Sequence, residues 1–182
     1  FKEMSAENMF DMVRNNVFPF IKEMGHGKET AYTRFMKDAI FLINKPRVLQ
    51  SLVEQVDDLD MNNRDTMGDV YEYILGKMAE KGQNGQFRTP RHIISMMVQM
   101  MKPSLEKEDA ICDPAMGSAG FLVEAAHYIA EHEKNMMVNT EKLNYYRSHM
   151  FTGYDTDTTM LRIGAMNMLL HKIDDPNIKE QD

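Results

Sequence analysis

A short apolar run that leads into a turn of small residues constrains the fold of this chain more than any other segment. The run is Ala110-Ile111-Cys112, the turn is Asp113-Pro114-Ala115-Met116-Gly117-Ser118-Ala119-Gly120, and an amphipathic helix begins at about Phe121. A strand, a tight loop and a helix N-terminus in this order are typical of the place where an α/β protein holds a nucleotide-like ligand. Glycine permits φ > 0 and lets a ligand approach the backbone. We therefore predict a ligand-binding loop, with Asp113 at the carboxyl end of the strand.

The first 80 residues carry only helical patterns. Apolar residues recur at helical spacing over residues 5–22, which are expected to end near Pro19, and over residues 30–44. Pro46 is suited to open a third helix, and a fourth apolar stripe runs from Met67 to Met78. No strand-like alternation and no internal repeat is present. We predict an α-helical N-terminal region over residues 1–80.

From residue 81 onward, strand and helix patterns alternate. Thr89 is suited to cap a helix that Pro90 opens and Pro103 ends. Strands 109–112 and 150–154 alternate with helices 120–133 and 158–171, and residues 134–148 are interpreted as a polar insertion. This order predicts a parallel sheet, and two strands are too few to complete one. We interpret residues 81–182 as part of an α/β domain, within a chain that is itself part of a longer protein.

Charge and cysteine usage bound the class of protein. The formal net charge of −7 argues against a stand-alone nucleic-acid binder that depends on phosphate contacts, although a partner subunit could supply a basic surface. The single cysteine, Cys112, excludes an internal disulfide, suits a reducing compartment and is expected to be buried in its strand. No signal peptide and no apolar run of membrane-spanning length is visible. A cytoplasmic protein with no membrane partner is expected.

The nineteen methionines and six histidines indicate no special site. Most methionines fall at helical core spacing, as Met96, Met97, Met100 and Met101 do, so core packing is favoured over a methionine-rich binding surface. The histidines show no metal-ligand spacing with carboxylates or with the cysteine. We therefore predict no metal site.

The aspartates that follow the two strands indicate the kind of ligand. Gly117 and Gly120 lack the full spacing of a dinucleotide fingerprint, whereas Asp155 follows the second strand, where a carboxylate can accept hydrogen bonds from a ribose diol. Asp113 and Asp155 without a phosphate cradle favour S-adenosylmethionine over NAD. One alternative stays open, in which Asp113 only caps its turn and Asp155 only caps the next helix.

Three segments in this order resemble the modification (M) subunit of type I restriction–modification systems. They are Gly85-Gln86-Phe87-Arg88-Thr89-Pro90-Arg91-His92-Ile93, the loop from Asp113 to Leu122, and Gly153-Tyr154-Asp155. M subunits are adenine-N6 DNA methyltransferases, and the similarity covers roughly residues 65–175. The resemblance implies a Rossmann-like S-adenosylmethionine-dependent methyltransferase domain, here in part, after the helical region.

The resemblance also implies roles for individual residues. The segment Gln86, Phe87, Arg88, Thr89, Pro90 and Arg91 would border the methionine moiety of the cofactor, and Thr89 would contact its carboxylate. Asp113 would lie near the charged methionine end, and Asp155 would take the ribose hydroxyls. The loop beneath the cofactor would comprise Pro114, Ala115, Gly117, Ser118, Ala119, Gly120 and Phe121. The family often has cysteine, threonine and glycine where Met116, Ser118 and Ala119 stand. Read without the resemblance, Thr89 is a helix cap, Phe87 a hydrophobic staple, and Arg88 and Arg91 are solvated charges.

The catalytic motif of this enzyme class is absent from the chain. The class needs an Asn/Asp-Pro-Pro-aromatic motif that binds and stacks on the flipped adenine, and the six prolines here include no Pro-Pro pair. We expect this motif beyond Asp182, so no catalytic residue is assigned and the chain alone is expected to be inactive. The implied partners are duplex DNA and the specificity (S) and restriction (R) subunits. Two alternatives remain open: a related methyltransferase acting on protein glutamine or RNA, and a non-catalytic interaction module whose helices dock a partner.

Overall fold

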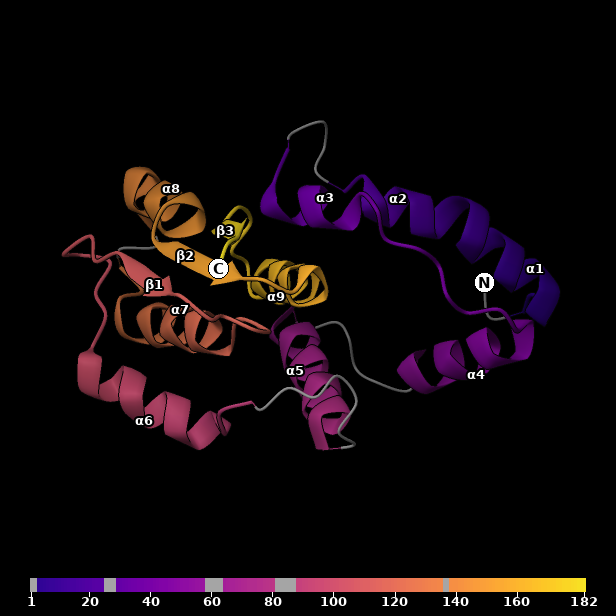
Figure 1. Cartoon of the computed structure of the whole chain (residues 1–182), viewed down its shortest axis with the longest axis horizontal. Coiled ribbons are helices and arrows are strands. Elements are labelled where there is room, and N and C mark those ends of the chain that lie inside the picture. Colours follow the sequence, from indigo (N-terminus) through magenta and orange to yellow (C-terminus); the bar gives the residue numbers. More distant parts are fainter. Residues whose placement is uncertain (1–2, 25–28, 58–63, 81–87, 136–137) are drawn as a thin grey trace.

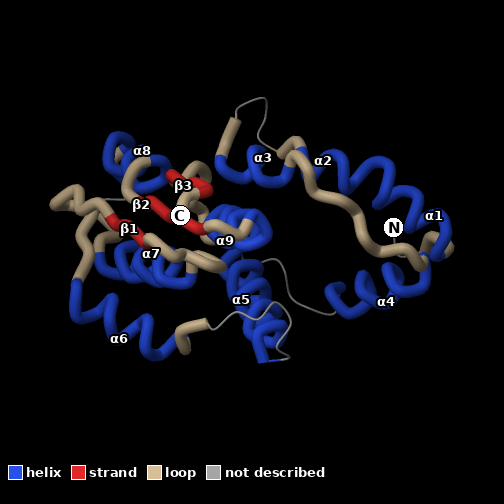
Figure 2. Tube along the Cα trace, in the orientation of Figure 1, coloured by secondary structure: helices blue, strands red, loops and turns tan. Residues whose placement is uncertain are grey.

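The protein is rich in helices and has one small sheet, and most of the helices in its first 57 residues lie apart from that sheet (Figures 1 and 2). The computed structural model describes residues 3–24, 29–57, 64–80, 88–135 and 138–182. No helix in these ranges has both the length and the apolar character needed to cross a bilayer. The elements are α1 (Ala6–Met12), a π-helical stretch (Val13–Val17), α2 (Phe18–Lys22), α3 (Ala31–Met36), α4 (Pro46–Asp57), α5 (Arg64–Glu80), α6 (Arg91–Met101), β1 (Ile111–Asp113), α7 (Gly120–His132), α8 (Thr140–Ser148), β2 (Phe151–Asp155), α9 (Thr158–Leu170) and β3 (Asn177–Glu180).

The three strands are parallel and follow one another in the order β1-β2-β3. Ile111 is in register with Phe151, and Gly153 is in register with Ile178. Helices α7 and α8 connect β1 to β2, and α9 leads from β2 to β3; α7 and α9 pack on the sheet and on each other. Their apolar faces and the buried strand residues form the main core. Because the strands are parallel, Asp113 and Asp155 end β1 and β2 at the same edge of the sheet.

The predicted parallel sheet is confirmed, but one helix beside it and one of its strands were not predicted from the sequence. Residues 134–148 contain α8, whose N-cap Asn139 accepts hydrogen bonds from the N–H groups of Glu141 and Lys142. Only Tyr146 of this helix is buried, so its composition is that of a polar loop. The third strand, β3, buries only Ile178 and therefore shows no apolar pattern.

Two helix ends in the N-terminal region differ from their predicted positions. The first helix continues past Pro19 to Lys22, because the chain widens into a π-helical stretch just before the proline, where the Phe18 N–H donates to the carbonyl of Val13. The helix predicted over 30–44 ends at Met36. The residues after it run without regular structure to Pro46, where α4 begins and packs against α1. In this segment Phe41 packs on the rings of Phe10 and Phe18, whereas Ile40 and Leu42 are exposed, so the helical spacing of residues 37–44 does not mark a buried helix face.

The expectation that the methionines of α6 and Cys112 are buried is wrong. Met96, Met97, Met100 and Met101 are 51, 45, 74 and 81% exposed, and Cys112 is exposed as well. Only the face of α6 with Ile94 and Val98 is buried, and α6 packs on α7. Cys112 lies on β1, which pairs with β2 alone among the described strands. A groove between α6 and β1 is lined by Met97, Met101 and Cys112.

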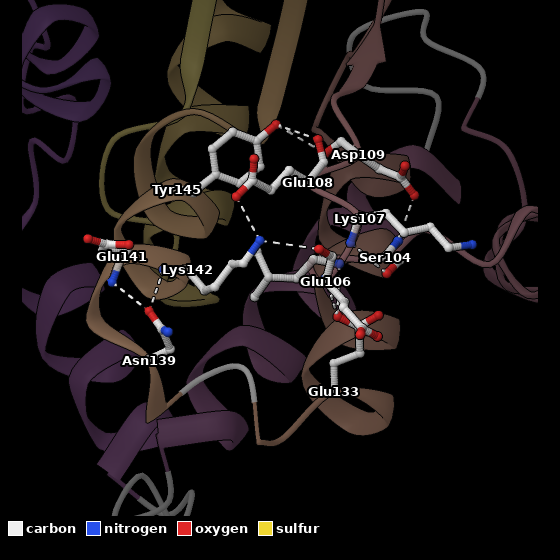
Figure 3. A network of polar contacts seen from close by, with 11 residues as sticks. Ser104, Glu106, Lys107, Glu108, Asp109, Glu133, Asn139, Glu141, Lys142 and Tyr145 are labelled. Carbon is white, nitrogen blue, oxygen red and sulfur yellow. Dashed lines mark hydrogen bonds and ion pairs between the residues drawn. The ribbon is translucent and has the colours of Figure 1, made fainter.

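A polar network fixes the chain where it enters β1 (Figure 3). The Glu133 carboxylate accepts hydrogen bonds from the N–H groups of Leu105 and Glu106, each at 2.9 Å. The Lys142 ammonium lies 2.7 Å from Glu108 Oε1 and also donates to the Glu106 carbonyl. These contacts join the turn before β1 to the end of α7 and to α8. The amino end of the strand is thus held independently of its carboxyl end.

We expect Gly164→Ala to destabilise the fold, although alanine normally stabilises a helix. A Cβ on Gly164 in α9 would lie 2.6 Å from Cε of Met116 and 3.2 Å from the carbonyl oxygen of Gly117. The free energy of unfolding should fall by about 1–2 kcal/mol as the loop after β1 is displaced. Gly76→Ala in α5 is the matched control, because its Cβ meets no atom within 4 Å and it should add about 0.5–1 kcal/mol. Urea unfolding of both variants measures the difference, and equal stability would contradict the tight packing.

Candidate functional site

A cleft of about 1270 Å³ opens at the carboxyl end of β1. One wall is the loop from Asp113 to Gly120, a second is the start of α6 with the residues before it, and a third is α5. Side chains of α7 and α9 complete the lining. The walls therefore come from segments far apart in the sequence.

Most of the site residues predicted from the sequence meet in this cleft. Those that line it are Arg88, Thr89, Pro90, Arg91, Asp113, Ala115, Gly117, Ser118, Gly120 and Phe121. Pro114 lines the neighbouring groove beside α6, and Ala119 is fully buried in the core. Asp155 is absent from the lining and lies against the loop, bonded to Gly117. Gln86 and Phe87 lie outside the described residues.

The loop after β1 is held by the end of β2. The Gly117 N–H donates to Asp155 Oδ2 at 2.9 Å, and the Met116 N–H donates to the Tyr154 carbonyl at 2.9 Å. Gly117 has φ 51°, a left-handed conformation that glycine adopts without strain. The other Asp155 oxygen accepts from the Asp157 N–H at 2.8 Å. Each carboxylate oxygen has capacity for a further hydrogen bond, so this role does not prevent Asp155 from binding a ligand.

Ala119 occupies a position that suits glycine better. It is the N-cap of α7 with φ 64° and ψ 28°, and this left-handed conformation costs a residue with a Cβ about 1–2 kcal/mol. Its side chain is nevertheless fully buried. The loop therefore retains a left-handed conformation at Ala119, although this conformation is strained for a residue with a Cβ.

Asp113 carries a carboxylate in a partly desolvated place. Its Oδ1 accepts from the Ala115 N–H at 3.1 Å, which closes the first turn of the loop. Burial raises the pKa of Asp113, the hydrogen bond from Ala115 lowers it, and the neighbouring Asp155 charge raises it again. Desolvation is the largest of these causes, so folding disfavours the ionised form of the Asp113 carboxylate.

The residues at the start of α6 differ from the sequence prediction in one respect. Thr89 is not the helix cap, because the N-cap is Pro90 and no side chain of the described residues caps it. Thr89 is exposed on the cleft wall. Arg88 and Arg91 face carboxylates of α5: Arg88 lies 2.9 Å from Glu72, and Arg91 lies 3.6 Å from Asp69. The Arg88 guanidinium therefore forms a salt bridge and is not simply a solvated surface charge.

Helix α5 is the part of the site that the sequence reasoning missed. The cleft is lined by Asp69, Glu72, Tyr73 and Gly76 at helical spacing, together with Glu124 and His127 of α7. The spacing of the α5 residues defines a polar face opposite the apolar stripe. That pattern is typical of a solvated surface, and nothing local indicates that α6 and the loop lie across from it.

Comparisons with known proteins agree on one family. The family model described as N-6 DNA Methylase matches residues 62–182. The StySPI type I restriction enzyme methylase subunit of Salmonella potsdam is 33% identical over 141 residues, covering 72% of this chain and 26% of the relative. The EcoKI methylase subunit of Escherichia coli K12 is 32% identical with the same coverage. The chain therefore spans about a quarter of the length of these relatives.

Solved structures show the same fold. A modification subunit assigned to a type I restriction enzyme from Vibrio vulnificus YJ016 matches with a TM-score of 0.69 at 23% identity, over 91% of this chain and 35% of that one. A chain from a study of complex assembly and conformational transition of the type I R-M system matches with a TM-score of 0.70 at 21% identity, over 99% of this chain and 37% of that one.

We expect Asp113→Asn to stabilise the protein at neutral pH. The wild-type pKa is raised on folding, so the ionised group disfavours the folded state above that pKa, and the penalty disappears below the unfolded value of 3.8. Asparagine keeps the acceptor for the Ala115 N–H and carries no charge. The melting temperature should rise by about 1–3 °C at pH 7, and the gain should vanish below about pH 4. A gain that is independent of pH would show that the charge is not its cause.

Proposed function

The chain belongs to the N-6 DNA methylase family, and on this premise we propose that it forms the cofactor-binding part of an adenine-N6 DNA methyltransferase of a type I restriction–modification system. The cofactor is S-adenosylmethionine, and its site is the cleft at the carboxyl end of β1. The observation that carries the proposal is the meeting of the β1 loop with Thr89 and Arg88 in one cleft. These are the segments that carry the resemblance to M subunits.

The proposal divides the chain into a helical region, residues 1–80, and part of a Rossmann-like methyltransferase domain, residues 81–182. The order β1-β2-β3 with α7 and α9 as crossover helices supports the second part. The similar solved structures support the overall arrangement. Helix α5 belongs by sequence to the first part, yet it packs on α9 of the second.

The charges of the cleft suit S-adenosylmethionine, which supplies an electrophilic methyl group on a positively charged sulfur. Four carboxylates and two guanidinium groups line the cleft: Asp69, Glu72, Asp113, Glu124, Arg88 and Arg91. The excess of carboxylates favours a cationic ligand. The exposed hydroxyl of Thr89 is suited to bind the amino-acid carboxylate, and Asp113 is suited to bind its ammonium.

The remaining residues act by orienting the ligand. The loop around Gly117 and Ser118 supports it from beneath, with Pro114, Ala115, Ala119, Gly120 and Phe121 setting the path of the backbone. Asp155 does not line the cleft but holds Gly117, which does, and the resemblance assigns the ribose hydroxyls to the remaining acceptor capacity of its carboxylate. Pro90 and Arg91 line the cleft at the proposed methionine end, and the resemblance assigns Gln86 and Phe87 the same role. Such orientation aligns the methyl group with the incoming adenine nitrogen, which is the main source of rate enhancement in this kind of transfer.

The other half of the reaction requires groups beyond this chain. We propose that the Asn/Asp-Pro-Pro-aromatic motif that binds the flipped adenine lies outside residues 1–182. Duplex DNA and the S and R subunits are the proposed partners, and the cytoplasm is the proposed location. Because the chain carries a net charge of −7, we assign most of the contacts with the DNA phosphates to a partner subunit.

Asp155→Asn in the full-length protein should weaken S-adenosylmethionine binding by at least about tenfold, since it removes charge-assisted hydrogen bonds to the ribose. Isothermal titration measures the dissociation constant. Asp174→Asn is the control, because Asp174 forms an exposed ion pair with Arg147 outside the cleft. Equal affinity of both variants and wild type would refute the ribose role. A folded wild-type protein that binds no cofactor would favour a non-catalytic interaction module.

Residues 1–182 alone should transfer no methyl group to DNA, because they hold no adenine-binding motif. Transfer of a radiolabelled methyl group to duplex DNA measures this, with the full-length protein and its S subunit as the positive control. Incorporation above background by residues 1–182 would overturn the assignment of the catalytic groups to the rest of the protein.

A further inference from the structure

We propose that Glu72 is a positioning residue that holds two walls of the cleft in place from α5. The inference rests on the proposed function and extends it to a helix outside the segments that resemble M subunits most closely. Each oxygen of the Glu72 carboxylate serves one wall. Oε2 accepts a hydrogen bond from Arg88, which lies before α6, and Oε1 accepts one from Asn167 of α9, which in turn holds the loop after β1.

The contacts form a continuous path. Arg88 Nη2 donates to Glu72 Oε2 at 2.9 Å, which fixes the residue that directly precedes Thr89. Asn167 Nδ2 donates to Glu72 Oε1 and also to the carbonyl of Ser118, the latter at 2.8 Å. Ser118 lies in the loop proposed to support the cofactor. The two walls are therefore joined through one carboxylate.

The burial of these side chains increases the energetic cost of losing their contacts. The side chains of Glu72 and Arg88 are 14 and 25% exposed, and Asn167 is fully buried. Removing one partner of this partly buried pair leaves the other group, and the buried amide of Asn167, without its hydrogen-bond partner, which is more costly than losing a fully exposed ion pair.

The amide of Asn167 depends on Glu72 for its orientation. Both hydrogens of Nδ2 are used by the Glu72 carboxylate and the Ser118 carbonyl, while Oδ1 finds no hydrogen-bond partner among the described residues. A flipped amide would turn its oxygen toward two acceptors, so the present orientation is favoured as long as Glu72 is there. Without the Glu72 carboxylate, the hydrogen bond from Asn167 Nδ2 to the Ser118 carbonyl is expected to weaken.

Helix α5 is anchored on α9 by contacts other than Glu72. Gly68 lies so close to α9 that a Cβ would be 2.5 Å from Nε2 of His171, and the Tyr71 hydroxyl donates to the Ile163 carbonyl at 3.4 Å. Leu75 is buried one turn further on. The helix should therefore stay docked when Glu72 is replaced, so an effect on ligand affinity can be separated from an effect on folding.

Asp69 provides the matched control on the same helix. It lies three residues before Glu72, lines the same cleft and pairs with the neighbouring Arg91 at 3.6 Å. Its pair is exposed, with side chains 65 and 58% accessible, and within the part of the chain that the structure describes no hydrogen bond joins Asp69 to α9 or to the loop. A general effect of negative charge on a cationic ligand would appear in both variants, whereas a positioning effect requires Glu72.

The test compares Glu72→Gln and Asp69→Asn in the full-length methyltransferase with its partner subunits. Glu72→Gln should raise the KM for S-adenosylmethionine by about tenfold or more, while kcat stays within about twofold. Asp69→Asn removes one lining charge without releasing either wall, so its rise in KM should be several-fold smaller than that of Glu72→Gln. Glu72→Asp, which keeps the charge but shortens the side chain, should also raise KM because it cannot span both contacts. Thermal unfolding is followed in parallel.

Two results would overturn the proposal. One is a lower melting temperature of Glu72→Gln and Glu72→Asp with an unchanged KM, which would make Glu72 only an anchor of α5. The other is an equal rise in KM for Asp69→Asn, which would make the effect one of charge alone. Failure of the proposed function itself would be distinct, because the wild-type enzyme would then show no dependence on S-adenosylmethionine.

Discussion

The hydrogen bond from the Gly117 N–H to the Asp155 carboxylate is the contact on which the site depends. It joins the loop after β1 to the end of β2, and the Met116 N–H repeats the connection one residue earlier through the Tyr154 carbonyl. On the side of α9, Gly164 leaves no room between the helix and the loop. The loop is thus fixed on the sheet and on α9, and it presents its remaining surface to the cleft. A ligand there meets a backbone that is already ordered, which lowers the entropy cost of binding.

The parts of this site that sequence reasoning recovered are those whose signal is local. The strand, the small-residue turn and the start of the helix that follows lie within about a dozen residues, so their order alone predicts the loop and the place of Asp113. Asp155 was found because parallel strands end at one edge of a sheet. The wall from α5 was missed, since Glu72 lies on a polar helix face that has no distinguishing pattern. Its partners Arg88 and Asn167 are 16 and 95 residues away.

The errors share a physical origin. Helical spacing identifies the apolar face of a helix but not whether a neighbour covers it, so the methionines of α6 were expected in the core and are exposed. Cys112 was expected to be buried as a small strand residue, but among the described strands β1 pairs with β2 alone, and Cys112 is exposed. Thr89 has the composition of a cap, yet the helix begins one residue later and leaves Thr89 on the cleft wall. In this last case the local rule fails at a position where a binding role is proposed.

The charges of the cleft give a reason for its choice of ligand that is independent of any resemblance. A dinucleotide places a pyrophosphate at the first helix N-terminus, which here would bring it against Asp113. The raised pKa of Asp113 shows that its charge is already disfavoured by burial and by Asp155, and a second anion would increase that cost. A cation in the same place offsets it. Because burial raises the pKa of Asp113, a cation beside this carboxylate would favour its ionised form, which agrees with the proposed cofactor.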